Sequence, residues 1–224
     1  MKKVALAALS LLLLTAITGC DSGPSQKSAP VQTLSIKGSD TMVHLVSSWT
    51  ETFMKTHADT DISVTGGGSG TGIAALLNGT TDICAASRAM KEKEQKQATD
   101  SKISPVEIPV ARDGIALIVH PENPVSNLTM DQLRLIYTGK VTNWKDVGGS
   151  DAPILLLSRE SSSGTFVFFQ EHVLNKEDFS TSARLLPGTS ALVQAVAADR
   201  GAIAYVGLGF AAEAQGKAKT IGIK

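Results

Sequence analysis

The chain has 224 residues, of which 21 are lysine or arginine and 21 are aspartate or glutamate, so its formal net charge at pH 7 is zero. A near-neutral chain with scattered charges lacks the basic face of a nucleic-acid-binding protein, which excludes nucleic acid as a partner. The length suits one large or two small domains, since domains commonly run to about 100–200 residues. No cluster of His and Cys has metal-ligand spacing, so neither a metal nor another cofactor is expected.

The first twenty residues predict where the protein goes. Two lysines precede an apolar run over residues 4–17, which is too short to cross a hydrocarbon core of about 30 Å comfortably. A basic start, a short apolar run and small residues are typical of a secretory signal peptide, here residues 1–19. The sequence Ile-Thr-Gly-Cys that ends this region resembles the bacterial lipobox, which makes Cys20 the expected lipidation site.

Residues 20–32 are small and polar and include two prolines, so a flexible tether is expected between the lipid anchor and the globular part. Asp21 directly follows the cysteine, and in enterobacterial lipoproteins this residue favours retention at the inner membrane. The expected location is therefore the periplasmic or extracellular face of the cytoplasmic membrane. With Cys20 acylated, Cys84 is left without an intrachain disulfide partner and is expected to be a small buried hydrophobe.

From residue 33 onward, short apolar runs typical of strands alternate with segments of helical spacing, which predicts an α/β fold with mostly parallel sheets. In a first lobe, residues 33–111, we expect strands at 33–36, 61–64 and 82–86, and helices at 43–57, 73–78 and 91–96. In a second lobe, residues 112–201, we expect a strand at 154–157 and helices at 130–137, 165–174 and 192–199.

Two further apolar runs, 106–110 and 114–119, predict strands that cross between the lobes. A strand at 201–206 is expected to return, so that residues 202–224 complete the first lobe. Two α/β lobes joined by crossing strands leave a ligand cleft between them, because ligands of open α/β sheets bind at the carboxyl ends of the strands.

Three segments share one pattern, a strand followed by a turn rich in Gly, Ser and Thr and then a helix: residues 37–42, 65–72 and 159–165. Helix N-termini present unpaired N–H groups and the positive end of the helix dipole, so each segment is a candidate oxyanion site. One such segment alone is better explained as an ordinary helix cap, but three of them in one two-lobed chain favour a binding site. Arg159 begins the third segment, where a guanidinium group can donate to two oxygens at once.

Five motifs together resemble the phosphate-binding component of bacterial phosphate ABC transporters: GSDTM at 38–42, GGGSGTGI at 66–73, ASR at 86–88, GKVTNWKDVGG at 139–149 and RESSSGTFVFFQEHVL at 159–174. The resemblance implies a two-lobed fold like that of periplasmic binding proteins, monomeric, with inorganic phosphate as ligand and an ABC permease as partner. It further implies that the contacts to phosphate come from Thr41, the backbone of Met42, Ser69, Ser87, Arg159, Ser163, Gly164 and Thr165.

One departure from the family concerns the anion's proton. Longer members carry, at the position of Ser87, an aspartate that accepts a proton from phosphate and so excludes sulfate. We expect Asp113 to accept this proton or to orient an arginine, while Arg88 either contacts the anion or pairs with a carboxylate. The family also usually continues past Gly209 with another strand and a helix, so either a longer chain or a short variant is expected.

Two alternatives to phosphate binding stay open. A binder of another oxyanion, such as sulfate or molybdate, would have the same architecture. A phosphatase-like enzyme would need Ser163 as a nucleophile, but no histidine lies in a segment expected to supply a base, and the glycine-rich turn has no Walker A lysine. No enzymatic activity is therefore expected, and the expected mechanism is closure of the cleft over the ligand by hinge motion at the crossing strands.

Overall fold

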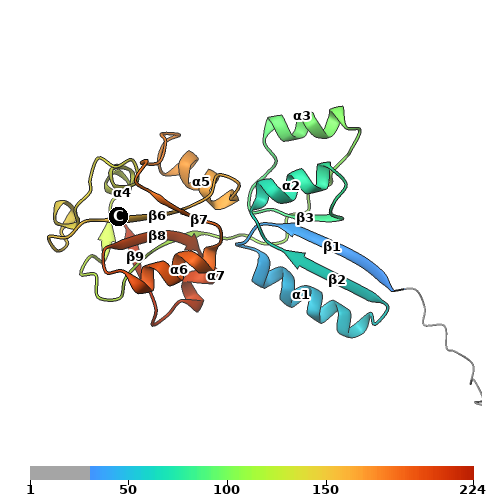
Figure 1. Cartoon of the computed structure of the whole chain (residues 1–224), viewed down its shortest axis with the longest axis horizontal. Coiled ribbons are helices and arrows are strands. Elements are labelled where there is room, and N and C mark those ends of the chain that lie inside the picture. The colour runs from blue at the N-terminus through green and yellow to red at the C-terminus, as the bar shows by residue number, and fades with distance from the viewer. Residues whose placement is uncertain (1–30) are drawn as a thin grey trace, which may run out of the picture. The chain divides into compact units, whose positions relative to one another are not determined.

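The structure, a computed structural model, describes residues 31–224; the predicted signal peptide, Cys20 and most of the predicted tether lie outside the described residues. The described part contains two separate sheets, one of three strands and one of six (Figure 1). Each sheet and its helices form one lobe. Among residues 31–224, no helix has the length and apolar character that a membrane span requires.

The first lobe is a parallel sheet covered on both faces by helices. Its strands lie in the order β2-β1-β3, and both outer strands run parallel to β1. Helix α1 packs its Val46 against Ile36 of β1, while α2 and α3 form a second apolar cluster. The elements are β1 (Gln32–Gly38), α1 (Val43–Thr56), β2 (Thr60–Thr65), α2 (Ser69–Leu77), β3 (Ile83–Ala85) and α3 (Glu92–Asp100).

The second lobe contains a mixed six-stranded sheet in the order β5-β9-β4-β8-β6-β7. Its elements are β4 (Ile115–Val119), β5 (Asn127–Leu128), α4 (Met130–Tyr137), the 3-10 helix η1 (Trp144–Val147), β6 (Leu155–Arg159), α5 (Gly164–His172), β7 (Arg184–Leu186), α6 (Thr189–Ala198), β8 (Ala202–Gly207), α7 (Leu208–Glu213) and β9 (Lys219–Ile223).

The core of the second lobe lies on both faces of this sheet. Successive side chains of a strand point to opposite faces. Accordingly Leu117 and Val119 of β4 belong to one buried cluster, and Ala116 and Ile118 belong to another. Every residue of β8 is buried. The predicted α/β, two-lobed fold is confirmed, and the larger hydrophobic core lies in the second lobe.

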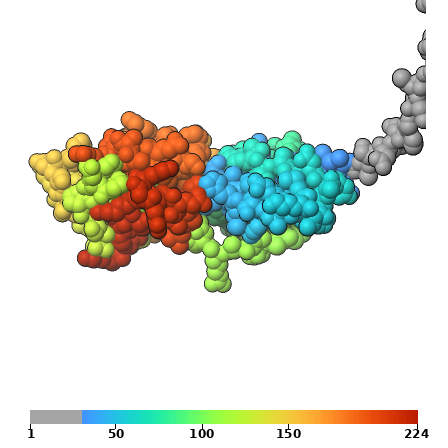
Figure 2. Space-filling model, turned by 90° about the horizontal axis from the view of Figure 1, so that it is seen from below, coloured from blue at the N-terminus to red at the C-terminus, as the bar shows by residue number. Residues whose placement is uncertain are grey.

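The predicted strand over residues 106–110 is wrong. The segment is irregular and highly exposed, with Val106 82% and Ile108 73% accessible. Pro105 and Pro109 explain this, because a proline has no N–H to donate to a neighbouring strand. Figure 2 shows this light green stretch of the chain standing out from the surrounding surface.

The prediction that residues 202–224 complete the first lobe is also wrong. β8 pairs with β4 and β6, and β9 pairs with β4 and β5, all within the six-stranded sheet. The apolar composition of β8 predicts a central, buried strand, but it does not specify which of the two sheets the strand joins. The strands β5, β7 and β9 were not predicted.

Candidate functional site

The three predicted Gly/Ser/Thr-rich segments meet where the two lobes touch. The hydroxyl of Thr41, after β1, lies 2.9 Å from that of Thr165 in the first turn of α5. The backbone N–H of Gly70, in the first turn of α2, donates to the carbonyl of Ser162 at 2.9 Å. Strand ends β1, β2 and β6 lead into these loops, so the carboxyl ends of strands from both sheets converge as the sequence pattern predicted.

Serine hydroxyl groups form a connected cluster on the first-lobe side of this contact. Ser87 lies at its centre, with its Oγ 3.0 Å from Ser39 Oγ and 3.2 Å from Ser69 Oγ. The backbone N–H of Ser87 also donates to Ser69 Oγ at 3.0 Å. The Cα of Gly164 lies directly against these groups, since a Cβ there would come within 2.5 Å of the hydroxyls of both Ser69 and Ser87.

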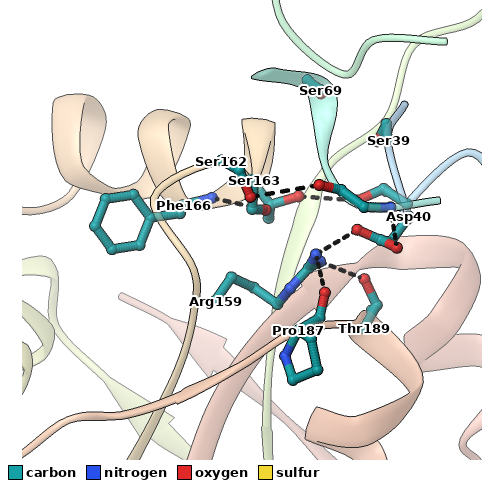
Figure 3. A network of polar contacts seen from close by, with 12 residues as sticks. Ser39, Asp40, Ser69, Arg159, Ser162, Ser163, Phe166, Pro187 and Thr189 are labelled. Atoms are coloured by element: carbon teal, nitrogen blue, oxygen red, sulfur yellow. Dashed lines mark hydrogen bonds and ion pairs between the residues drawn. The ribbon is translucent and has the colours of Figure 1, made fainter. Parts of the chain in front are cut away.

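Arg159 is the charged centre of the site. It ends β6 and is only 2% exposed. Its guanidinium group donates from Nη1 to Thr189 Oγ1 at 2.8 Å and from Nη2 to the Pro187 carbonyl at 3.0 Å (Figure 3). Its Nε has no hydrogen-bond partner among the described residues. A buried N–H of a charged group without a partner is costly, which marks this atom as a donor available to a ligand.

Asp40, which is not among the predicted site residues, supplies the carboxylate that pairs with Arg159. Its Oδ2 lies 2.5 Å from Arg159 Nη2, and its Oδ1 accepts from the Gly67 N–H at 3.0 Å (Figure 3). The ion pair therefore joins the first lobe to the second. The sequence feature that could have identified Asp40 is its place in the GSDTM motif, directly before the predicted site residue Thr41. In the structure its neighbours are the buried Ser39 and Thr41, which contacts the second lobe.

Two of the predicted ligand-binding residues make hydrogen bonds within their own loops; within residues 31–224, Ser163 accepts there and keeps its O–H free, whereas the Met42 N–H donates. Ser163 is the N-cap of α5, and its Oγ accepts from the Phe166 N–H at 3.3 Å. The N–H of Met42 donates to the Ser39 carbonyl at 3.1 Å in the turn before α1. Helix α2 starts at Ser69, earlier than predicted, directly after Gly68, whose φ of 92° suits glycine.

Arg88 pairs with a carboxylate, one of the two outcomes expected for it. Its Nη1 and Nη2 each donate to a carboxylate oxygen of Glu94 in α3 at 2.7 Å. Burial raises the pKa of Glu94, but the hydrogen bonds from Arg88 and from the Lys91 N–H outweigh it, and the net pKa lies below the ordinary value. The Arg88 Nη2 also lies 3.5 Å from the position that a Cβ on Gly70 would take. The Arg88–Glu94 pair therefore packs against the first turn of α2, next to the site.

Asp113 lies close to Thr41 but orients no arginine in the described structure. Its Oδ1 accepts from the N–H groups of Gly114 at 2.8 Å and Leu208 at 3.3 Å. A Cβ on Gly207 would meet both its Oδ2, at 2.7 Å, and the methyl group of Thr41, at 2.8 Å. The carboxylate that orients Arg159 is Asp40, not Asp113.

A cavity of about 180 Å³ opens beside the Asp40–Arg159 pair. Asp40, Val43, His44 and Gly66 line it from the first lobe, and Gly188, Thr189, Ser190 and Phe210 line it from the second. The Nδ1 of His44, in α1, lies 3.0 Å from Glu213 Oε2 in α7, so this ring is a second polar contact between the lobes. The cavity gives solvent access to the Asp40 side of the ion pair, while Arg159 stays buried.

Cys84 lies behind this site at the end of the three-stranded sheet and is partly buried. Burial raises the pKa of its thiol to about 11, so it is protonated near neutral pH and is a poor nucleophile. Within residues 31–224, no group of three or more His, Cys, Asp or Glu side chains is arranged to hold a metal ion.

The arrangement can bind a small oxyanion. It combines hydroxyl groups from both lobes, the N-termini of α2 and α5, and one buried arginine, all donors that suit anionic oxygens. Its two charged members, Asp40 and Arg159, cancel, so attraction comes from hydrogen-bond donors and local dipoles and not from a net positive charge.

The sequence profile described as the PBP superfamily domain matches residues 23–223. The phosphate-binding protein PstS of Staphylococcus epidermidis is 35% identical over 216 residues, covering 95% of this chain and 66% of that protein. The phosphate-binding protein PstS of Staphylococcus haemolyticus is 33% identical over 234 residues, covering 100% of this chain and 73% of that protein. The chain thus spans slightly less than two thirds of the first relative's length.

Solved structures show the same similarity. A putative phosphate ABC transporter substrate-binding protein with bound phosphate from Clostridium perfringens is 35% identical with a TM-score of 0.77, covering 86% of this chain and 76% of that one. An ABC-type phosphate transport receptor from Vibrio cholerae is 29% identical with a TM-score of 0.61, covering 85% of this chain and 76% of that one.

Proposed function

Since the chain belongs to the PBP superfamily, within the family of the phosphate-binding proteins named PstS, we propose that it binds inorganic phosphate for an ABC transporter. It captures the anion outside the cytoplasmic membrane and delivers it to the permease. The observation that supports this most is the buried Arg159, whose Nε lacks a partner while hydroxyl-bearing loops from both lobes surround it.

The donors available match what a small tetrahedral oxyanion requires. Burying a multiply charged ion is costly unless each of its oxygens accepts hydrogen bonds. The first lobe contributes Thr41, Ser69 and Ser87, and the second lobe contributes Arg159 and the first turn of α5 with Ser163, Gly164 and Thr165. With phosphate between them, the Thr41 and Thr165 hydroxyls exchange their mutual hydrogen bond for bonds to the ligand.

Binding proceeds with closure of the two lobes. The groups that bind the anion lie on both lobes, so phosphate first meets donors on one lobe and is then enclosed by the other. The closed form is the one that the permease recognises. Retention at the membrane is provided by a lipid on Cys20, which places the protein on the outer face of the cytoplasmic membrane, where a monomer can reach its transporter.

Isothermal titration of the purified protein, freed of bound anion, tests the ligand. We expect tight binding of phosphate and no measurable heat from sulfate or molybdate under the same conditions. Preference for sulfate or molybdate would leave the site in place but replace the ligand, which is the alternative function left open by the donor set. No binding of any of the three anions would contradict the proposal.

The same preparation separates a binder from an enzyme. Incubation with a phosphate monoester should release no phosphate, because among the described residues the Ser163 Oγ hydrogen-bonds only to the Phe166 N–H, which cannot take its proton. Release of phosphate at a rate that depends on Ser163 would contradict the proposal.

A further inference from the structure

A second contact between the lobes lies outside the group of anion donors. His44 is the second residue of α1 in the first lobe, and the centroid of its ring lies 4.6 Å from that of Phe210, in α7 of the second lobe. The Nδ1 of the same ring lies 3.0 Å from the Oε2 of Glu213, the last residue of α7. None of these residues is among those predicted to contact the anion. We refer to His44, Phe210 and Glu213 as the latch.

Each half of the latch is fixed within its own lobe. On the first-lobe side, α1 packs its Val46 against Ile36 of β1, so His44 moves together with the three-stranded sheet. On the second-lobe side, Phe210 is 7% exposed and belongs to a buried cluster on the six-stranded sheet. A rotation of one lobe against the other therefore moves His44 relative to Phe210 and Glu213.

The latch combines a hydrogen bond with ring packing. An ionised carboxylate only accepts hydrogen bonds, so the His44 Nδ1 donates to Glu213. The side chains of His44 and Glu213 are 52% and 61% exposed, and an exposed pair of this kind contributes little by itself. The imidazole ring adds to it by packing against the buried ring of Phe210, because aromatic pairs stabilise beyond the area that they bury.

The latch and the anion site border the same cavity but share no hydrogen bond. The cavity of about 180 Å³ is lined by Asp40, which pairs with Arg159, and also by His44 and Phe210. Among the described residues, the one side-chain hydrogen bond of His44 goes to Glu213. A change at the latch therefore leaves the donors around the anion in place.

We propose that the latch stabilises the closed arrangement of the two lobes, and thereby sets the affinity for the anion without influencing which anion is bound. The inference rests on the proposed binding of phosphate between the lobes. The apparent affinity of a protein falls in proportion to the fraction of molecules in the binding-competent form. Weakening the latch lowers this fraction for every ligand alike, whereas changing a residue that touches the anion alters the preference between ligands.

The test compares the affinities for phosphate and arsenate in the wild type, His44→Ala, Glu213→Ala and the double variant. Arsenate is a tetrahedral oxyanion that keeps a proton near neutral pH, as phosphate does, so both use the same donors. By isothermal titration we expect His44→Ala to weaken both anions by the same factor, about threefold to tenfold. Glu213→Ala should have a smaller effect, and it should add little to His44→Ala, because the hydrogen bond is then already lost.

The helix α1 itself supplies the matched control, His57→Ala. His57 is exposed at the end of this helix, and its ring stacks on Phe53 of the same lobe with centroids 3.8 Å apart. Its loss should leave both affinities unchanged. His44→Phe keeps a ring against Phe210 and loses the hydrogen bond, so its affinities should lie between those of the wild type and His44→Ala. The side chains of His44 and Glu213 are more than half exposed, so these variants keep the buried core intact.

Scattering separates a failure of this inference from a failure of the proposed function. Small-angle scattering without any anion should show that His44→Ala is more extended on average than the wild type and His57→Ala. Unchanged affinities in His44→Ala overturn the inference, and so does a changed ratio of phosphate to arsenate affinity, which would place His44 at the anion. Wild-type protein that binds neither anion overturns the proposed function. In that case equal dimensions of the wild type and His44→Ala overturn the inference too, and different dimensions support it.

Discussion

At the scale of single residues, the site depends on the hydrogen bonds that fix the position of the Arg159 side chain. Its guanidinium group is fixed by Thr189, by the Pro187 carbonyl and by Asp40, and its backbone N–H is 3.4 Å from the hydroxyl of Tyr205. Burial raises the pKa of Tyr205 to about 12, so this phenol is a neutral partner near pH 7. The planar fork of arginine, and not its charge alone, makes these contacts simultaneously.

Replacing Arg159 with lysine should therefore weaken phosphate binding by about 10- to 100-fold, although the charge is kept, since a lysine ammonium cannot bond Asp40, Thr189 and the ligand in this geometry. Isothermal titration measures the loss. The same change at the exposed Arg184 of β7 serves as control and should leave the affinity unchanged. Full affinity in Arg159→Lys would show that charge alone suffices.

At the scale of elements, α3 is joined to the site through one ion pair. Arg88 follows the Ser87 turn after β3, and Glu94 lies in the first turn of α3; their side chains are 10% and 19% exposed. Glu94 also accepts from the Lys91 N–H at 2.8 Å, so the same carboxylate caps the helix. The position of the Ser87 loop thus depends on this helix.

Glu94→Gln should destabilise the protein at pH 7 by about 1–3 kcal/mol, because it leaves Arg88 without its charged partner. The folded-state pKa of Glu94 is lowered, so its contribution is fully present above the ordinary carboxyl pKa of about 4.3 and is lost as pH falls through the folded value. Urea denaturation at several pH values should therefore show the difference between wild type and variant shrinking below about pH 4.

Glu107→Gln is the control for this measurement, because Glu107 lies exposed in the irregular segment before β4. It should change the free energy of unfolding by no more than about 0.5 kcal/mol at any pH. A difference between wild type and Glu94→Gln that stays constant down to pH 3 would contradict the assignment of its effect to the ionised carboxylate.

At the scale of the whole described unit, Gly164 of the second lobe lies directly against hydroxyl groups of the first lobe. A Cβ at this position would lie 2.5 Å from the hydroxyls of Ser69 and Ser87, closer than real contacts allow. Because Gly164 is the first residue of α5, an alanine there is compatible with the helix itself. The glycine is required by the approach of the other lobe.

Gly164→Ala should leave the melting temperature nearly unchanged but weaken phosphate binding by about 10-fold or more, because the added methyl group holds the lobes apart. Small-angle scattering should show compaction on phosphate addition in the wild type and less of it in the variant. Gly209→Ala in α7, where a Cβ meets nothing within 4 Å, is the control. Equal compaction in Gly164→Ala and wild type would contradict this role.

The α/β alternation, the two-lobed fold and the three donor loops follow from the sequence alone, because strand and helix periodicity and turn chemistry are local properties. The family resemblance of the five motifs is confirmed by the relatives. These motifs also singled out Arg159 and Thr165, which the structure brings together with Thr41.

Only the tertiary structure determined the contacts between residues that are far apart in the sequence, namely the strand pairing and the ion pair of the site. It assigned β8 and β9 to the six-stranded sheet, because the partners of a strand are set by which edges meet and not by the composition of that strand alone. It also chose Asp40, and not Asp113, as the partner of Arg159. The two residues are 119 positions apart in the chain, and an ion pair over that separation exists only once both lobes have folded and met.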